Sequence, residues 1–234
     1  MKKVLTSAIL LALTATGAQA ASVNLRHEYK PEFGDQKSTY ADRIEVSHRF
    51  KSGIGFAVES KYKDEDSSSD HNDDLVSNGS QANISYQMKL NDSFTLTPQY
   101  KIEGSGDMAH QFNLTLGYKV NDDWSVSYRQ RYNQSQHDNY YNQGTFAFSY
   151  KGIEDWGVSG SLDYRVTGGD NKAEVWDGED KGISEINFKG QYNGLESGWK
   201  PFAEFGVTPS KKDSSDTTKD NWRPRLRVGV VYNF

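Results

Sequence analysis

The chain ends in the stretch Trp222-Arg-Pro-Arg-Leu-Arg-Val-Gly-Val-Val-Tyr-Asn-Phe234. Its even-numbered positions are almost all apolar, whereas its odd-numbered positions begin with Arg223, Arg225 and Arg227 and end with Asn233. A period of two residues is the pattern of a β-strand with one apolar and one polar face. Aromatic residues at both ends of the apolar face are typical of a strand that crosses a membrane in a β-barrel. The stretch therefore predicts a barrel strand whose arginines point inward; the bland interpretation is an ordinary amphipathic edge strand.

The other end of the chain predicts export. Met1-Lys2-Lys3 is basic, residues 4–15 are apolar or small, and Ala18-Gln19-Ala20 has the A-x-A form of a cleavage site. These are the three parts of a secretory signal peptide, so we expect residues 1–20 to be removed and the mature barrel to span 21–234. The apolar part is too short to cross a bilayer as a helix. If the mature chain enters a membrane, it must do so with strands.

The composition fits a membrane barrel better than a soluble or disordered chain. The mean hydropathy of −0.83 is low, yet 13% of the residues are aromatic, which argues against disorder. A barrel reconciles the two, because only alternate strand residues are apolar and its loops are polar. The chain has no cysteine, which excludes disulfides and thiolate metal sites. The formal net charge is −5, but the acidic residues gather in the predicted loops.

The same alternation recurs along the whole mature chain, in segments of about ten residues, the length that a tilted strand needs to cross the hydrocarbon. The connections alternate between short turns and longer polar loops, as in outer-membrane barrels. We therefore predict an all-β fold, a transmembrane antiparallel up-and-down barrel of 12 strands with both termini on the periplasmic side. The predicted strands are 22–30, 40–50, 54–63, 81–90, 94–103, 110–120, 124–132, 146–151, 156–166, 185–192, 199–207 and 222–234.

Three prolines fall inside predicted strands. Pro98, Pro201 and Pro224 each lack the N–H group that a strand donates to its neighbour. Every strand of a closed barrel has two neighbours, so we expect these prolines at bulges or strand ends.

The inward face of the predicted strands is strongly basic. Seven acids share it, namely Glu28, Glu45, Glu59, Glu103, Asp163, Glu185 and Glu204. The eighteen predicted cations are Arg26, Lys30, Arg43, Arg49, Lys61, Lys63, Lys89, Lys101, Lys119, Arg129, Arg131, Lys151, Arg165, Lys189, Lys200, Arg223, Arg225 and Arg227. Charges in a narrow channel set its ion preference, so this excess predicts an anion-selective pore.

Some of these charges are expected to pair with one another. Glu28, Glu45 and Glu59 lie close in sequence to basic residues, and we expect such pairs to brace the barrel. We expect the three arginines of the last strand to repel one another and to be available to anions, because a guanidinium matches a carboxylate with two parallel hydrogen bonds. The residues predicted to line the substrate path are Arg26, Arg43, Arg49, Lys61, Lys101, Lys119, Arg129, Arg131, Arg165, Lys189, Arg223, Arg225 and Arg227.

The signal peptide, the twelve short strands, the basic inner face and the ending Arg-Pro-Arg-Leu-Arg-Val-Gly-Val-Val-Tyr-Asn-Phe resemble the oligogalacturonate-specific porin family, the KdgM-type porins, which includes a sialic-acid channel. The resemblance implies a monomeric channel for acidic oligosaccharides with two facing tracks of basic side chains. One track maps onto Arg223, Arg225, Arg227, Arg26 and Arg43, and the other onto Arg129, Arg131 and Arg165. A register error of one residue would invert this mapping.

The expected partners are outer-membrane lipid, acidic oligosaccharides, and the barrel-assembly machinery, which would bind the last strand through Phe234. We expect a Gram-negative outer-membrane location and no nucleic acid, cofactor, metal or enzymatic activity. Sialate or alginate oligomers stay open as substrates, because all of them carry carboxylates.

Three further interpretations compete with the channel. The first is a plugged structural or adhesin barrel, which would conduct negligibly. The second is calcium binding by the acidic loop around Asp64, Asp66 and Asp73, which lacks the spacing of a defined calcium loop. The third is a barrel enzyme of the phospholipase or protease kind, which would need a histidine with a partner.

No local pattern provides such a partner for any of the five histidines. They are His27, His48, His71, His110 and His137. We expect the first, second and fourth of these on the outer face near strand ends and the other two in loops.

Overall fold

The computed structural model describes residues 21–34, 36–64, 75–104, 108–135, 139–169, 175, 179–210 and 221–234. The predicted signal peptide lies outside these residues. Within the described ranges, no helix is long and apolar enough to cross a membrane.

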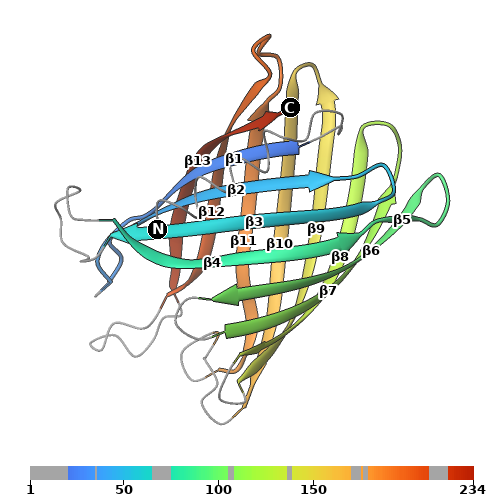
Figure 1. Ribbon diagram of the computed structural model, residues 1–234. Coiled ribbons are helices and arrows are strands. Elements are labelled where there is room, and N and C mark those ends of the chain that lie inside the picture. The colour runs from blue at the N-terminus through green and yellow to red at the C-terminus, as the bar shows by residue number, and fades with distance from the viewer. Residues whose placement is uncertain are drawn as a thin grey trace.

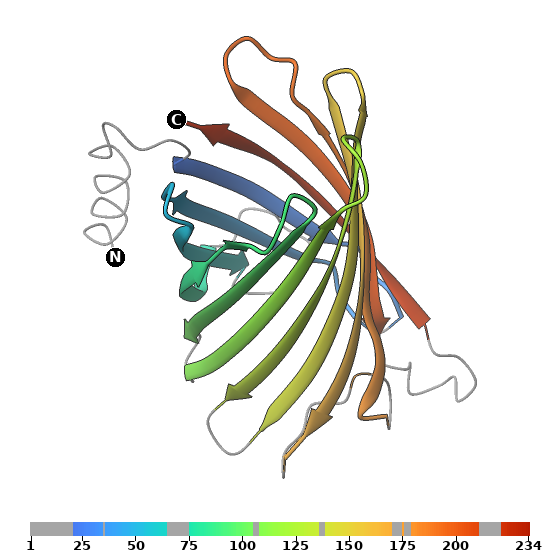
Figure 2. The same ribbon diagram turned by 90° about the vertical axis from the view of Figure 1, so that its right-hand side faces the viewer.

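The described chain forms one antiparallel sheet that closes on itself (Figures 1 and 2). Each strand pairs with the next along the chain, except that β4 and β5 both pair with β6 and not with each other, and β13 pairs with β1. β5 continues β4 after an interruption at Gln87, so the wall has the twelve strands that the sequence predicts. The strands are β1 Ala21–Lys30, β2 Thr39–Arg49, β3 Ile54–Asp64, β4 Leu75–Tyr86, β5 Met88–Lys89, β6 Phe94–Gly104, β7 Met108–Lys119, β8 Trp124–Ser135, β9 Tyr140–Ile153, β10 Trp156–Gly168, β11 Lys181–Tyr192, β12 Trp199–Ser210 and β13 Asn221–Asn233.

Five short turns lie at one end of the barrel, where β1 begins and β13 ends (Figure 1). They are the turns 50–53, 90–93, 120–123, 154–155 and 193–198. We call this end the short-turn end, and the opposite end the long-loop end. The predicted alternation of short and long connections holds except at 105–107 and 136–139, which lie at the long-loop end but are as short as the turns.

The apolar residues face outward and the polar residues face inward, as predicted. Along β7 and β9, Phe112 and Phe146 are 54% and 52% exposed, whereas Gln111 and Gln143 are 3% and 2% exposed. Polar side chains reach one another across an intervening strand, as Lys61 of β3 does with Glu103 of β6. Such contacts need a concave surface, on which side chains converge, so the polar face lines the lumen.

Aromatic side chains form a belt near the short-turn end of the outer face. Phe94 stacks on Tyr118 with ring centroids 4.6 Å apart, and Trp124 lies 4.5 Å from Tyr150. These residues are direct cross-strand partners, so the register itself brings the rings together. Aromatic belts of this kind flank the lipid-facing band of membrane barrels.

The three prolines lie inside strands without a register shift, so the expectation of bulges is wrong. Pro98 pairs with Leu114, and on its other side the ladder is interrupted at Gln87, which donates its backbone N–H to Gly53 instead. Pro201 and Pro224 each lie beyond the end of the ladder with one neighbour. The expectation of strand ends is wrong as well, because all three prolines are interior residues of their strands. Each proline instead lies where one of its two neighbouring ladders is interrupted or has stopped.

Several strands are longer than predicted at the long-loop end. β4 begins at Leu75, inside a segment that the sequence predicts as a loop from 64 to 78, and β9 and β11 begin at Tyr140 and Lys181. Backbone ladders continue beyond the hydrocarbon, where the outer face needs no apolar residues, so the alternating signal stops before the strand does. A register shift between Ser60 and Tyr62 accompanies Gly79, whose φ of 95° suits a bulge glycine.

Candidate functional site

The arginines of β13 are held by carboxylates of the neighbouring strands. Arg227 donates to Glu28 and to Glu204, each at 2.6 Å, and Arg225 binds Glu185 with two hydrogen bonds. Arg225 is only 4% exposed. The expectation that these guanidiniums repel one another without partners is therefore wrong. Glu185 and Glu204 lie far from β1 in sequence, and only closure of the barrel brings all three carboxylates around β13.

Arg223 of the same strand holds a loop instead of a carboxylate. Its guanidinium donates to the backbone oxygens of Pro31 (3.0 Å), Lys30 (3.3 Å) and Lys37 (2.5 Å), and to Gln36 Oε1 at 2.9 Å. These acceptors belong to the β1–β2 connection. Arg223 is 7% exposed, so it fastens this connection to the wall.

The pairing predicted for Glu28 and Glu59 is confirmed. Arg43 contacts Glu59 at 2.9 Å, Lys61 contacts it at 3.8 Å, and Arg26 lies 4.0 Å from Glu28. The pairing predicted for Glu45 is wrong: Glu45 lies directly opposite Glu59, which takes Arg43, and among the described residues no cation lies within 4.0 Å of it. This wall of the lumen, from β3 through β1 and β13 to β11, carries its charges as a network of opposite signs, which we call the paired wall.

The arginines of β8 and β10 have a different environment. Arg129 donates to Thr145 Oγ1 at 3.1 Å, and Arg131 donates through Nε to Asn113 Oδ1 at 2.9 Å. Arg165 donates twice to Gln143 Oε1, at 3.0 and 2.8 Å. All three bind neutral side chains. We call Arg129, Arg131 and Arg165 the guanidinium row.

The guanidinium row has no direct ion pair, although the carboxylate of Asp163 interacts electrostatically with Arg129 and Arg131. Among the residues that the structure describes, no carboxylate oxygen lies within 4.0 Å of these three side chains. They are half-buried, in contrast to the buried Arg223 and Arg225. A guanidinium has five N–H groups, and Arg131 donates only its Nε–H to a described residue, so further donors stay available in the lumen.

β9 lies between the strands of the row and positions it. Thr145 and Gln143 are the direct cross-strand partners of Arg129 and Arg131, and Gln143 is also the partner of Arg165. Gln143 is 2% exposed and donates to Asp163 Oδ2 at 2.7 Å, which orients its oxygen toward Arg165. The Arg165 guanidinium also lies 4.4 Å from the centroid of the Tyr141 ring.

The remaining predicted path residues are scattered along the lumen. Arg49 binds Gly53 O and Ser85 Oγ, and Lys101 binds Gln81 and Glu103. Lys189 lies 4.9 Å from the centroid of Phe202.

At the short-turn end, Lys119 donates to Asp122 at 2.6 Å. Asp122 lies in a turn outside the strands, and its hydrogen bond with Lys119 lowers the pKa of the carboxyl below its ordinary value. The side chains of Lys119 and Asp122 are 52% and 94% exposed, so this pair is a solvent-screened surface contact.

Sequence reasoning missed the buried amides that position the basic residues. Asn113 donates to Gln99 at 3.1 Å while accepting from Arg131, and Gln99 donates to Asn83 at 3.1 Å. The alternation of polar and apolar residues does predict that these side chains face the lumen. Their partners depend on the register between strands, which the period of two does not give.

The described histidines lie on the outer face, as predicted. His27 has a partner that the sequence did not indicate: its Nδ1 lies 2.9 Å from Asp42 Oδ1 on the adjacent strand. His110 bonds to Tyr100 at 2.8 Å, and His48 packs edge-on against Phe50. His71 and His137 lie outside the described residues, as does most of the acidic loop considered for calcium. Within the described part of the chain, no group of three or more histidines or acids could hold a metal ion.

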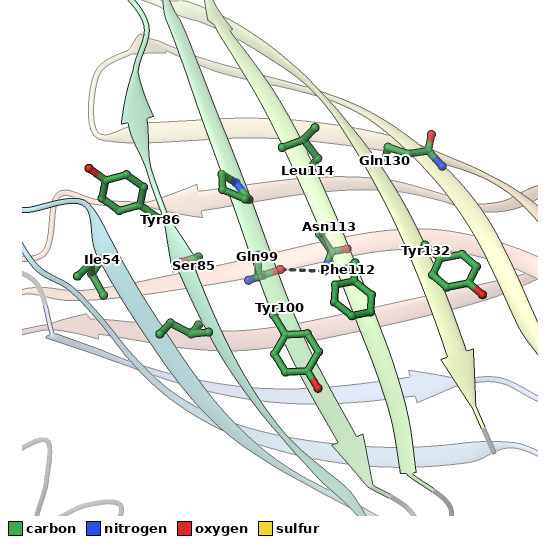
Figure 3. A pocket seen from close by; sticks show the side chains of 12 residues that line it. Ile54, Ser85, Tyr86, Gln99, Tyr100, Phe112, Asn113, Leu114, Gln130 and Tyr132 are labelled. Carbon is green, nitrogen blue, oxygen red and sulfur yellow. Dashed lines mark hydrogen bonds between the residues drawn. The ribbon is translucent and has the colours of Figure 1, made fainter.

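One groove lies outside the lumen. It has a volume of about 780 Å³ and is lined by outward apolar residues such as Ile84, Tyr100, Phe112, Leu114 and Tyr132 (Figure 3). Its lining is almost entirely apolar, and it opens on the face that the aromatic belt assigns to lipid. The charged chemistry of the molecule lies on the other side of the wall.

A closed twelve-stranded barrel with an apolar outer face and a charged inner face defines the class of outer-membrane channel proteins. The family model described as "Oligogalacturonate-specific porin protein (KdgM)" matches residues 14–234. The chain belongs to this family of porins, which are channels and not enzymes.

Individual relatives agree with this assignment. The oligogalacturonate-specific porin KdgM of Dickeya dadantii (strain 3937) is 30% identical over 245 residues, which cover 99% of each chain. The solved KdgM porin is 26% identical, with a TM-score of 0.62, covering 91% of this chain and 99% of that one. A structure of the KdgM porin in complex with disordered oligogalacturonate has the same identity and coverage and a TM-score of 0.61. The NanC porin, 16% identical, shares the fold with a TM-score of 0.72 over 91% of this chain and all of that one.

Proposed function

We propose that this porin is a passive, anion-selective channel for acidic oligosaccharides, with oligogalacturonate as its substrate. The observation that carries the proposal is the guanidinium row. Arg129, Arg131 and Arg165 lie on one wall of the lumen, are half-buried, and bind only neutral side chains among the described residues. Their charge is therefore available to a carboxylate that passes through the lumen.

The spacing of the row suits a substrate with repeated carboxylates. Arg129 and Arg131 are two residues apart on β8 and share one face, and Arg165 lies two strands away in the same cross-strand row as Arg131. Each planar guanidinium can bind a carboxylate with two parallel hydrogen bonds. A carboxylate of an anionic chain can thus move from one guanidinium to the next. No single site then has to bind the chain tightly, and such weak binding at several sites is what passage through a channel requires.

The paired wall has a different part in the proposed mechanism. Arg225 and Arg227 are neutralised by Glu28, Glu185 and Glu204, and Arg43 by Glu59, so they contribute little net charge. Arg223 has no carboxylate among its acceptors and binds the β1–β2 connection instead. The predicted track of Arg223, Arg225, Arg227, Arg26 and Arg43 thus serves chiefly to hold the barrel and the β1–β2 connection. Anions are drawn to the opposite wall, where Asp163 offsets the field of the three guanidiniums only in part.

The cellular setting of this channel is part of the proposal. After removal of residues 1–20, the mature chain would be inserted in the outer membrane as a monomer, with its short-turn end in the periplasm. The outward face would contact lipid. The closing strand, with its terminal Phe234, would present the signal for the assembly machinery. The name of the relative from Dickeya dadantii supports oligogalacturonate over sialate or alginate oligomers.

The decisive experiment is the reversal potential of the purified porin in a planar bilayer under a KCl gradient, followed by addition of oligogalacturonate. Chloride preference and current block by the acidic sugar are the expected results. Cation preference, or the absence of conductance, would overturn the proposal and favour a plugged barrel.

A further inference from the structure

A second region of the lumen has a chemistry that the guanidinium row does not explain. At the short-turn end, residues of β5 to β10 line a half-open cavity of about 660 Å³. Its inward side chains are Thr95, Ser125, Ser127, Ser149 and Ser159, beside Gly117 and Ala147. The volume lies in the range of about 300–1,000 Å³ that is usual for small-molecule sites.

The register of the strands explains why the wall is hollow here. Thr95, Gly117, Ser127 and Ala147 are successive cross-strand partners on β6, β7, β8 and β9, and Ser161 continues the row on β10. A second row nearer the turns consists of Ser125, Ser149 and Ser159, with Lys119 and Lys189 as the cross-strand partners at its two ends. Thr95 of the first row is likewise the partner of Lys89. Between these flanking lysines, the named members of the two rows are no larger than threonine. The same strands carry arginines and amides in the middle of the barrel, so the lumen widens toward the turns.

The hydroxyl groups of this cavity are free to bind a ligand. Among the residues that the structure describes, the side chains of Thr95, Ser125, Ser127, Ser149 and Ser159 make no hydrogen bond. They are half-buried or exposed. By contrast, Ser22 and Ser47 on the opposite wall at the same end bond to each other at 2.8 Å.

The charges beside the cavity are few. Lys119 contacts the exposed Asp122, and Lys89 lies exposed at the edge near Asp92, without a salt bridge to a described carboxylate. A hydroxyl both donates and accepts, and it carries no charge. This cavity therefore suits the hydroxyl groups of a sugar ring more than its carboxylate.

From this placement we propose that the hydroxyl-lined cavity is a saccharide-binding subsite, which receives a pyranose ring through its hydroxyl groups after its carboxylate leaves the guanidinium row. The inference deepens the proposed function and rests on it for the direction of transport. It adds a site that recognises the neutral part of the substrate. Transfer from charged to neutral donors loosens the sugar before it reaches the periplasm.

The test compares current block by trigalacturonate and by its methyl ester, which keeps the hydroxyls but has no charge. The pocket variant is S125A/S127A/S149A/S159A. The matched control is S22A/S47A, which removes two hydroxyls from the same end that already satisfy each other. A second comparison is R129Q/R131Q/R165Q. Heat modifiability on gels and the chloride preference verify that each serine variant has folded.

We expect the pocket variant to shorten the residence of both sugars about tenfold, as the loss of one or two net hydrogen bonds implies, with unchanged chloride preference. The arginine variant should shorten only the residence of the acid. One outcome separates the two proposals. If the wild-type porin lacks chloride preference, the proposed function fails. If the ester nevertheless blocks the wild-type current and does not block the pocket variant, the subsite stands. Three outcomes would overturn the subsite. The sugars could reside equally long in the pocket variant and in wild type, or the S22A/S47A control could shorten their residence as much as the pocket variant does. The third outcome is that neither sugar blocks the wild-type current.

Discussion

Arg227 of β13 and Glu28 of β1 are direct cross-strand partners, and Arg227 Nε lies 2.6 Å from Glu28 Oε2. The two residues are separated by almost the whole chain, and their strands meet at the seam where the barrel closes. Arg227 also reaches Glu204 on β12. One guanidinium thus connects the strands on both sides of its own.

Substitution of Arg227 by Met should destabilise the barrel by about 2 kcal/mol, because hydrogen bonds to charged groups contribute more than neutral ones. It would also leave the carboxylates of Glu28 and Glu204 without their shared partner. Unfolding in urea from lipid vesicles measures the effect. Arg131→Met is the matched control, since Arg131 loses only a bond to Asn113, and it should cost less. If the two variants lose the same free energy of unfolding, the contact between Arg227 and Glu28 contributes no more to stability than an ordinary lumen hydrogen bond.

Neutralising the guanidinium row in R129Q/R131Q/R165Q should move the reversal potential toward zero and weaken block by oligogalacturonate at least about tenfold, the equivalent of one charge-assisted hydrogen bond. Reversal potentials and blocking constants in planar bilayers check both effects. The control R225Q/E185Q removes one cation and its partner, so the net charge of the lumen stays constant. Retained anion preference in the triple variant, or an equal loss in the control, would contradict the assignment of the path to this wall.

Arg223→Gln should release the β1–β2 connection, because Arg223 donates to three backbone oxygens of residues 30, 31 and 37 and to Gln36. Trypsin should then cleave after Lys37 about tenfold faster, since a segment that opens locally becomes accessible to proteases. Mass spectrometry of the fragments locates the cut. Arg165→Gln, which removes another lumen arginine, should leave this rate unchanged, and a slow, wild-type rate in R223Q would show that the connection is held by other contacts.

Deletion of Phe234 should lower the amount of protein in the outer membrane more than it lowers folding in detergent. The backbone N–H of Phe234 donates to Ala21 O at 2.8 Å, and its ring packs edge-on against Tyr232. These contacts are small on the scale of the whole barrel. Cell fractionation and heat-modifiability gels separate the two effects. Normal membrane levels of the shortened chain would argue against a role of this residue in assembly.

The alternation of residues predicted the number of strands and the face of each side chain. Inward arginines such as Arg129 and Arg225 could be assigned because a period of two has only two phases. What could not be predicted is the residue opposite each of them. Arg225 meets Glu185 and Arg131 meets Asn113, and this difference between two similar arginines depends on strand register and on contacts across an intervening strand.

The ends of the strands were less predictable for a related reason. Leu75 and Tyr140 begin strands in segments whose side chains are mostly polar, so their hydrogen-bonded ladder leaves no trace in the apolar pattern. The hydroxyl-lined cavity could not be predicted from the sequence either. Single serines such as Ser127 and Ser149 carry no signal on their own strands, and only the pairing of β6 to β10 places them in rows.

The contacts of β13 also bear on how an unfinished barrel would differ from a complete one. Glu28, Glu185 and Glu204 belong to three other strands, yet they share the cations of β13. A chain that has not yet added its last strand therefore has both unpaired edges and three carboxylates that lack these cations. Insertion of β13 removes the two defects in a single step, so a chain truncated before this strand would lack a stable resting state and would be a ready target for quality-control proteases.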